Sequence, residues 1–163
     1  MGPTCSIIYE NEPIEPGTMQ RPPRKAGLSF LSLKQLSVSI IQGLMITAGC
    51  LGIGYYYLQL EHDHATIRSI IFITLLFSNI FLTLVNRSFV YPVFKTLTYK
   101  NNLVPLITCI TLSFIVALLY VPFVRDLFRL NSLSLSQIAG SVVVALISTL
   151  WIDVWKLLNR GKQ

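Results

Sequence analysis

Residues Ile67–Val85 of the chain read IRSIIFITLLFSNIFLTLV, and this stretch decides the fold class. Its single charged residue is Arg68, next to the start. A hydrocarbon core of about 30 Å is crossed by about 20 mostly apolar residues in a helix that rises 1.5 Å per residue. Because a backbone in lipid must satisfy its own hydrogen bonds, the stretch predicts a transmembrane helix and not a buried strand.

Three further stretches have the same length and character. They run from Leu36 to Leu58, from Leu103 to Val124 and from Ile138 to Leu158. Of the 163 residues, 53% are hydrophobic and 12% are charged, whereas about a quarter are charged in an average soluble protein. The mean hydropathy is +0.63. We therefore predict an all-α integral membrane protein, whose four transmembrane helices form two hairpins.

The basic residues predict how these helices are oriented. One set of segments carries ten of them: Arg21, Arg24, Lys25, Lys34, Arg87, Lys95, Lys100, Lys156, Arg160 and Lys162. The opposite connections carry only Arg68, Arg125 and Arg129, together with three acidic residues. Since cytoplasmic loops hold the excess of Lys and Arg, both termini are predicted to be cytoplasmic. The net charge of +6 is explained by this topology, so nucleic acid is set aside as a partner.

Small residues recur along two of the predicted helices. Ser39, Gly43 and Thr47 follow one another at every fourth position of the first helix, with Ala48 and Gly52 beside them. Around the start of the last helix lies a similar set: Ser136, Gly140, Ser141 and Ala145. Such stripes let a neighbouring backbone approach closely, so both are expected to pack within the bundle.

Polar residues within the spans are expensive in lipid and usually face protein or a wet cavity. The simplest interpretation of Gln42 is that its side chain forms a hydrogen bond to another helix. Asp153 has Lys156 three residues later, which favours an ion pair at the membrane interface. Asn79 lies deep in the second helix and leaves two interpretations open, a packing amide between helices or part of a polar path.

Motifs for catalysis are absent from the sequence, which has no GxxxxGK[ST], HExxH or CxxC pattern. The stretch Glu61–His64 reads EHDH and contains metal-ligand residue types. Adjacent residues of a tight loop rarely converge on one ion, so a solvated turn is favoured over a metal site. The three cysteines indicate no disulfide framework, because their number is odd and two of them lie in apolar segments.

Several stretches, in order, resemble one family of membrane proteins. Residues 3–24 read PTCSIIYENEPIEPGTMQRPPR, a short apolar stretch followed by an acidic, proline-rich linker. This resembles the connection after the sixth membrane helix of P-type cation-transporting ATPases. Four later stretches are similar to their seventh to tenth helices: QGL from Gln42, LLFSNIFLTLVNRS from Leu75, LLYVPFVRDLF from Leu118 and WIDVWKLLNR from Trp151.

The resemblance implies a division of the chain into three parts. Residues 1–35 would be the end of a membrane helix plus a cytoplasmic linker, residues 36–158 the four-helix transmembrane domain, and residues 159–163 a cytoplasmic tail. The chain is then expected to be a fragment or a split chain that begins within the sixth helix. Its partners would be the lipid bilayer, the remaining helices and cytoplasmic domains of the pump, and the transported cation. It would lie in the cell membrane as a multi-pass protein.

The resemblance also implies what chemistry the chain takes part in. The phosphorylated aspartate and the sites for ATP and Mg²⁺ belong to domains outside this sequence, so no cofactor and no activity are expected for the chain alone. In calcium pumps of the reticulum type, the eighth helix lends a carboxylate to a cation, and Asn79 matches that position. Gly2 matches the ligating aspartate of the sixth helix and cannot ligate. Asn79 is thus a candidate ligand of the transported cation, with Ca²⁺ as the expected ion.

An autonomous four-helix transporter or an accessory subunit is the alternative. Small transporters are commonly built from internal repeats. The two predicted hairpins do not match one another convincingly, which favours the pump.

Overall fold

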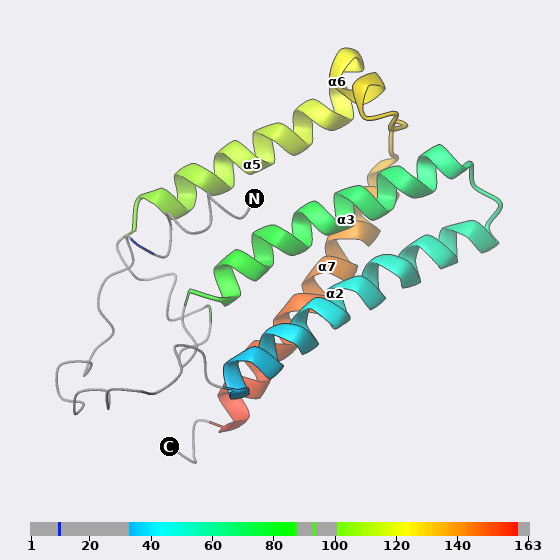
Figure 1. Cartoon of the computed structure of the whole chain (residues 1–163). Helices are drawn as coiled ribbons and strands as arrows, with labels where there is room; N and C mark the ends of the chain where they lie inside the picture. The colour runs from blue at the N-terminus through cyan, green and yellow to red at the C-terminus, as the bar shows by residue number, and fades with distance from the viewer. Residues whose placement is uncertain (1–9, 11–32, 88–92, 94–100, 160–163) are drawn as a thin grey trace.

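The structure, a computed structural model, describes residue 10 and residues 33–87, 93 and 101–159. All regular structure in this part of the chain is helical, and four helices are long and apolar enough to cross a membrane. These are α2 (Leu33–Gln59), α3 (His64–Val85), α5 (Leu103–Tyr120) and α7 (Leu135–Asn159), with a short α6 (Pro122–Leu127) before α7 (Figure 1). The predicted all-α class with four long apolar helices is confirmed. Of the two predicted hairpins, only the first is a packed pair among the described residues, because α5 and α7 pack on α3 and not on one another. Most of the predicted linker and the tail beyond Asn159 lie outside the described residues.

Side-chain caps define where two of the helices begin. Asp63 caps α3 by accepting a hydrogen bond from the backbone N–H of Ala65 at 3.3 Å. At the start of α7, the N–H of Ser134 donates to Gln137 Oε1 at 2.8 Å, and the N–H of Gln137 donates to Ser134 Oγ at 3.4 Å. This reciprocal pair is a capping box, which satisfies backbone donors that the first turn of a helix leaves free.

The third predicted span ends earlier than its hydropathy indicated. We predicted a helix from Leu103 to Val124, but α5 ends at Tyr120 and a separate helix starts at Pro122. Proline lacks a backbone N–H and disfavours the helical conformation of the residue before it. Accordingly, Val121 is extended, with φ −88° and ψ 111°.

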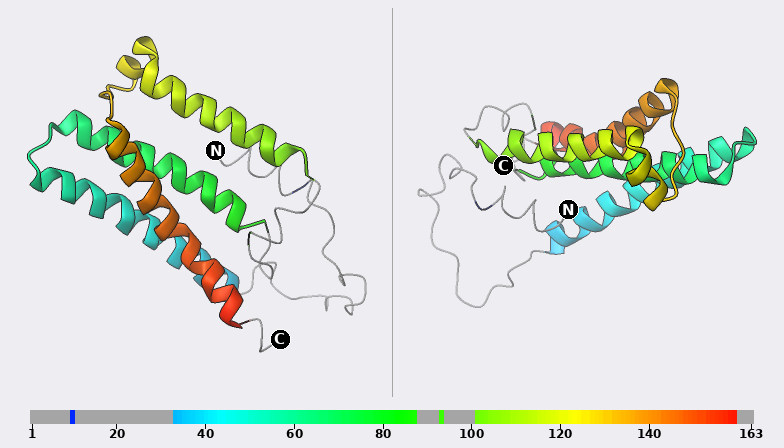
Figure 2. Two further views of the ribbon diagram at one scale, coloured as in Figure 1. Left: turned by 180° about the vertical axis from the view of Figure 1, so that it is seen from behind. Right: turned by 90° about the horizontal axis from the view of Figure 1, so that it is seen from above.

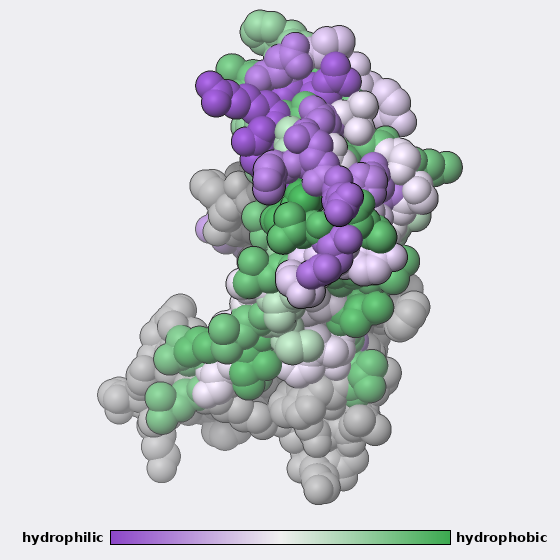
Figure 3. Space-filling view, turned by 90° about the vertical axis from the view of Figure 1, so that its right-hand side faces the viewer, coloured by the Kyte–Doolittle hydropathy of each residue, from purple (hydrophilic) through white to green (hydrophobic). Residues whose placement is uncertain are grey.

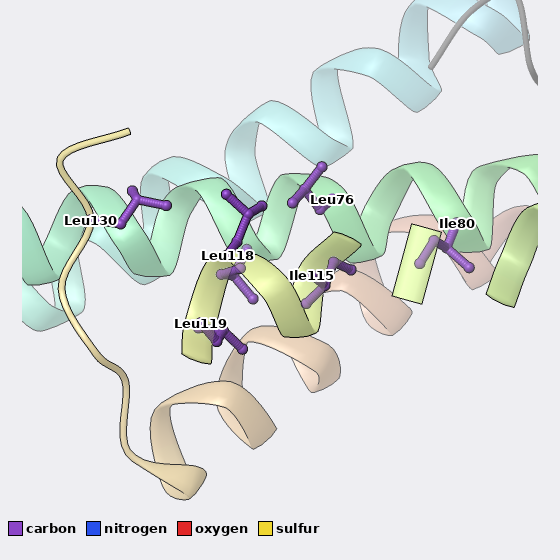
Figure 4. Close-up of a cluster of buried hydrophobic side chains, with 7 residues drawn as sticks. Leu76, Ile80, Ile115, Leu118, Leu119 and Leu130 are labelled. Atoms are coloured by element: carbon purple, nitrogen blue, oxygen red, sulfur yellow. The ribbon is translucent and has the colours of Figure 1, made fainter. Parts of the chain in front are cut away.

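Three long helices lie side by side, and the fourth crosses two of them. Figure 1 shows the order α2, α3, α5, and the left view of Figure 2 shows α7 crossing α2 and α3 on one side. The helices α2 and α3 form a hairpin, whereas α5 packs on α3, and α7 packs on α3 and α2. A core cluster joins α3, α5 and the loop after α6 (Figure 4). Its buried members are Ile73, Leu76, Ile80, Ile115, Leu118, Leu119 and Leu130.

The helix ends sort into two groups. The start of α2, the end of α3, the start of α5 and the end of α7 lie at one end of the bundle, which we call the inner end (Figure 1). The α2–α3 turn and α6 lie at the other, outer end. This alternation matches the grouping of connections on which the predicted topology depends.

The glycines in contact are not those of the predicted stripe on α2. A Cβ added at Gly43 or at Gly52 would have no contacting atom within 4 Å. The close approaches are at Gly49, where a Cβ would lie 3.2 Å from Ser148 Cβ, and at Gly54, where it would lie 2.7 Å from Ile71 Cδ1. Packing of the Ser39–Gly43–Thr47 stripe against a helix of the described chain was therefore a wrong expectation.

The stripe on α7 does pack as predicted. Ser141 and Ala145 are fully buried, and a Cβ at Gly140 would lie 3.7 Å from the hydroxyl of Tyr57 on α2. Small residues on this face of α7 therefore allow its close contact with the α2–α3 hairpin.

Candidate functional site

Asn79 lies on α3, nearly two turns before the end of the helix at Val85. Its side chain is half-buried, whereas that of the preceding Ser78 is fully buried. Consecutive residues of a helix point about 100° apart. Asn79 therefore projects from a different side of α3 than the one that Ser78 buries.

One half of the Asn79 amide is satisfied by its own helix. Nδ2 donates a hydrogen bond to the carbonyl oxygen of Leu75 at 3.0 Å. Within the part of the chain that the structure describes, the Oδ1 atom accepts no hydrogen bond. The interhelical packing bond considered for Asn79 is absent from these residues, and the oxygen remains available to a donor or a cation.

The neighbouring hydroxyls do not converge with Asn79 on one point. Thr83 Oγ1 donates back to the carbonyl oxygen of Asn79 at 2.8 Å. The buried Ser78 Oγ has no hydrogen-bond partner among the described residues. Those residues also contain no group of three or more His, Cys, Asp or Glu side chains that could hold a metal ion. Because Ca²⁺ takes six to eight oxygen ligands, Asn79 can supply one ligand but not a site by itself.

Two small residues of α2, Gly43 and Thr47, lie on the same side of the helix as Gly54 but are open in the structure. Gly43 and Gly54 are eleven residues apart, which is three helical turns, so they share one side of α2 with Thr47. Gly54 packs against Ile71 of α3, but Gly43 touches nothing and Thr47 is exposed. The two helices are therefore in close contact at the outer end and leave this side of α2 uncovered toward the inner end.

The direction of Asn79 relative to α2 is indicated by Asn86, which follows α3. Asn79 and Asn86 are seven residues apart and thus share one side of the helical path. Asn86 Oδ1 accepts a hydrogen bond from Gln42 Nε2 of α2 at 3.3 Å, so α2 passes close to the residue that follows α3. Ile71, which packs against Gly54, is eight residues before Asn79 and so lies about 80° from it around α3. We call Gly43, Thr47, Leu75 and Asn79 together the α2–α3 face. It combines a stripe of small residues with one unsatisfied amide oxygen.

Two other polar residues hold the inner end together. Gln42 is buried, and its bond to Asn86 confirms the predicted interhelical hydrogen bond. Asp153 is also buried, and its Oδ2 accepts a hydrogen bond from the backbone N–H of Val93 at 3.1 Å. Asp153 thus holds the backbone of Val93 against α7, a contact that the sequence did not predict. The side chain of Lys156, its predicted ion-pair partner, lies outside the described residues.

A polar network at the outer end was also missed by the sequence reasoning. Asn131 donates from Nδ2 to Asp63 Oδ2 and to Thr66 Oγ1, both at 3.2 Å, and from its backbone N–H to Ser69 Oγ at 2.8 Å. These bonds fasten the loop after α6 to the first turns of α3. The residues are far apart in sequence, so no local pattern could have indicated the network.

Comparison with known proteins assigns the family. Residues 1–158 match the family model of the cation transporting ATPase C-terminus. A search of individually curated proteins gives no match. The family match covers almost the whole chain, including all four long helices of the structure. The chain therefore belongs to the P-type cation-transporting ATPases and forms their C-terminal membrane region.

Proposed function

We propose that this domain supports the transport helices of a calcium-type P-type pump, and that those helices seat on the α2–α3 face. The observation that carries the proposal is the amide of Asn79, which projects from a membrane-spanning helix with its oxygen unsatisfied. A polar group in a span normally faces protein or a wet cavity and not lipid. We therefore expect a further protein element to cover the α2–α3 face.

The small residues beside Asn79 indicate what kind of element fits. Small residues such as glycine and threonine, spaced four positions apart, let two helix backbones approach closely. Thr47 Oγ1 already donates to the carbonyl oxygen of Gly43 at 2.9 Å, so its hydroxyl needs no acceptor on the partner helix. A transmembrane helix of the pump satisfies both requirements, because it brings close packing to Gly43 and a donor or a bound cation to Asn79.

The proposed cation is Ca²⁺, a hard ion that takes neutral amide oxygens as well as carboxylates. Asn79 would add one oxygen to ligands from other helices. ATP and Mg²⁺ would bind the cytoplasmic domains of the pump, which supply phosphoryl transfer and are not part of this sequence. In this proposal the chain is a fragment or a split chain, and it hydrolyses no ATP alone.

The test compares Gly43→Leu with Gly52→Leu in the chain co-expressed with the upstream part of the pump. Both glycines are open in the structure, but Gly52 lies on another side of α2. We expect Gly43→Leu to weaken association about tenfold or more, since an overpacked helix contact costs about 1–3 kcal/mol. Co-purification and cation-stimulated ATP hydrolysis are the measurements, and Gly52→Leu should match the wild type in both.

Equal association of the two variants would show that no helix seats on the α2–α3 face. Cation transport by the purified chain in vesicles without an upstream part would instead support the autonomous four-helix transporter.

The proposed pump lies in the cell membrane with both termini in the cytoplasm, as the ten basic residues on that side indicate. A reporter fused after Gln163 should therefore be cytoplasmic. One inserted between Glu61 and His62, which spares the capping residue Asp63, should be external. The two locations can be read with a glycosylation tag and a cytoplasmic enzyme fusion. A cytoplasmic location for the inserted reporter would contradict this orientation.

A further inference from the structure

The short helix α6 exposes apolar side chains at the outer end of the bundle. Phe123 is 78% exposed and Leu127 is 70% exposed. They are four residues apart and so lie on the same side of the helix. Neighbouring exposed apolar side chains of this kind can mark a surface that contacts protein or membrane.

Two other apolar residues, Val124 of α6 and Phe128 after it, contact the bundle. Val124 packs against the core cluster of α3 and α5. The ring of Phe128 lies 5.9 Å from that of Phe72 and 6.4 Å from that of Phe114, measured between centroids. One side of α6 therefore packs on the bundle through Val124. Phe123 and Leu127 project away from the bundle and form an exposed apolar surface.

The polar residues of α6 lie opposite this surface. At about 100° per residue, the apolar positions 123, 124, 127 and 128 cover one arc of about 140°, and Arg125 and Asp126 lie outside it. Figure 3 looks toward the outer end and shows hydrophilic side chains gathered there, with hydrophobic side chains beside them. A short element with one apolar and one charged side is typical of the boundary between lipid and water.

The position of α6 along the bundle agrees with that boundary. The preceding α5 has 18 residues, which span about 27 Å at 1.5 Å per residue, close to the thickness of a hydrocarbon core. Its exposed residues Val116 and Tyr120 are four residues apart and share one side of the helix near its end. The exposed surface of α6 therefore continues the lipid-facing surface of α5 at the level where the hydrocarbon ends.

Hydrogen bonds fix the orientation of α6 relative to the bundle. The N–H of Leu130 donates to the carbonyl oxygen of Arg125 at 2.9 Å, and the N–H of Arg129 donates to that of Asp126 at 3.0 Å. With Arg129 at φ 52°, these bonds form a Schellman motif that ends the helix. Leu130 is buried in the core cluster, and the guanidinium of Arg68 on α3 donates to the carbonyl oxygen of Arg129.

We propose that α6 is an interfacial anchor that binds the phospholipid bilayer at the outer end. Phe123 and Leu127 insert at the boundary between acyl chains and headgroups, and Arg125 and Asp126 face the headgroups and water. The anchor sets the depth of α5, since the Val121–Pro122 break joins the two helices. The proposal rests on α6 and α5 alone and does not depend on the identity of the transported cation.

The test reads the depth of a single tryptophan in the full chain, reconstituted in phosphatidylcholine vesicles. Trp151 and Trp155 are replaced by phenylalanine, and Phe123→Trp is compared with Asp126→Trp. The quenchers are acrylamide, which stays in the water, and lipids with bromine on the acyl chain. The bromine is either near the headgroup (shallow) or near the end of the chain (deep). For Phe123→Trp we expect at least about twofold stronger quenching by shallow bromine than by deep bromine or acrylamide, because interfacial helices bury their apolar side by about 5–10 Å.

The control Asp126→Trp should be quenched mainly by acrylamide. Quenching of Phe123→Trp mainly by acrylamide would place it in water and overturn the proposal. Protection from every quencher would show that protein covers it, which overturns the proposal equally. If circular dichroism shows that Phe123→Trp does not fold, Leu127→Trp reports the same depth from the same side of the helix.

Discussion

Replacing Asn79 with alanine should lower the apparent cation affinity of the assembled pump by about ten- to hundredfold, because a hydrogen bond or ligand contact to a charged group contributes about 1.5–3 kcal/mol. The structure supports this expectation because Asn79 Oδ1 accepts no bond within the described chain, while Nδ2 is held by Leu75. The hydrogen bond to Leu75 also orients the amide. Replacing Asn79 with aspartate should raise the affinity or change the stoichiometry, because it adds a negative charge beside a hard cation.

The measurement is the cation dependence of ATP hydrolysis for the chain assembled with its upstream part. Ser78→Ala is the matched control, since it removes the adjacent hydroxyl, which is buried and has no partner among the described residues. It should leave the cation dependence unchanged. Equal cation dependence of the wild type, Asn79→Ala and Asn79→Asp, with only the yield of protein altered, would make Asn79 a structural residue.

Replacing Gly49 with leucine should destabilise the chain by about 3 kcal/mol, the upper range for an overpacked core position. A Cβ at Gly49 would already lie 3.2 Å from Ser148 Cβ and 3.3 Å from Val144 Cγ1 on α7. Leucine adds three further carbons where α2 and α7 are in contact. The helices must separate to admit them, which loses buried contacts on both.

Reversible unfolding of the chain in detergent micelles, followed by circular dichroism, measures this change. Gly52→Leu is the control because it makes the same substitution on α2 with open space around it. Its free energy of unfolding should equal that of the wild type or exceed it by up to about 1 kcal/mol, because leucine favours a helix more than glycine does. A Gly49→Leu chain as stable as Gly52→Leu would contradict the contact between α2 and α7.

Some predicted features followed from short-range patterns and agree with the structure. The helices α2, α3 and α7 begin and end within three residues of the predicted spans. The end of α5 could have been predicted as well, because Pro122 stands inside the predicted span and proline breaks a helix. Gln42 was predicted to bond between helices, and it does so with Asn86.

Other features required the tertiary structure. Gly43, Thr47 and Gly54 share one side of α2, yet only Gly54 meets α3, and near Gly43 it is Gln42 that reaches the end of α3. Spacing shows which residues share a side but not how far away the neighbouring helix runs. The direction of Asn79 was open for the same reason, and so was the network from Asn131 to Asp63, which joins residues 68 positions apart.

The sequence by itself determined that the chain crosses a membrane as four helices, how its basic residues are grouped, and the family that it resembles. These follow from the length of the apolar stretches, from the need of a backbone in lipid to satisfy its own hydrogen bonds, and from motifs in a fixed order. Only the tertiary structure decided that Gly49 and Gly54 are the close contacts and that the side of α2 with Gly43 stays open. The physical reason is that helix packing depends on the angle and distance between two axes, which side chains far apart in the sequence set together.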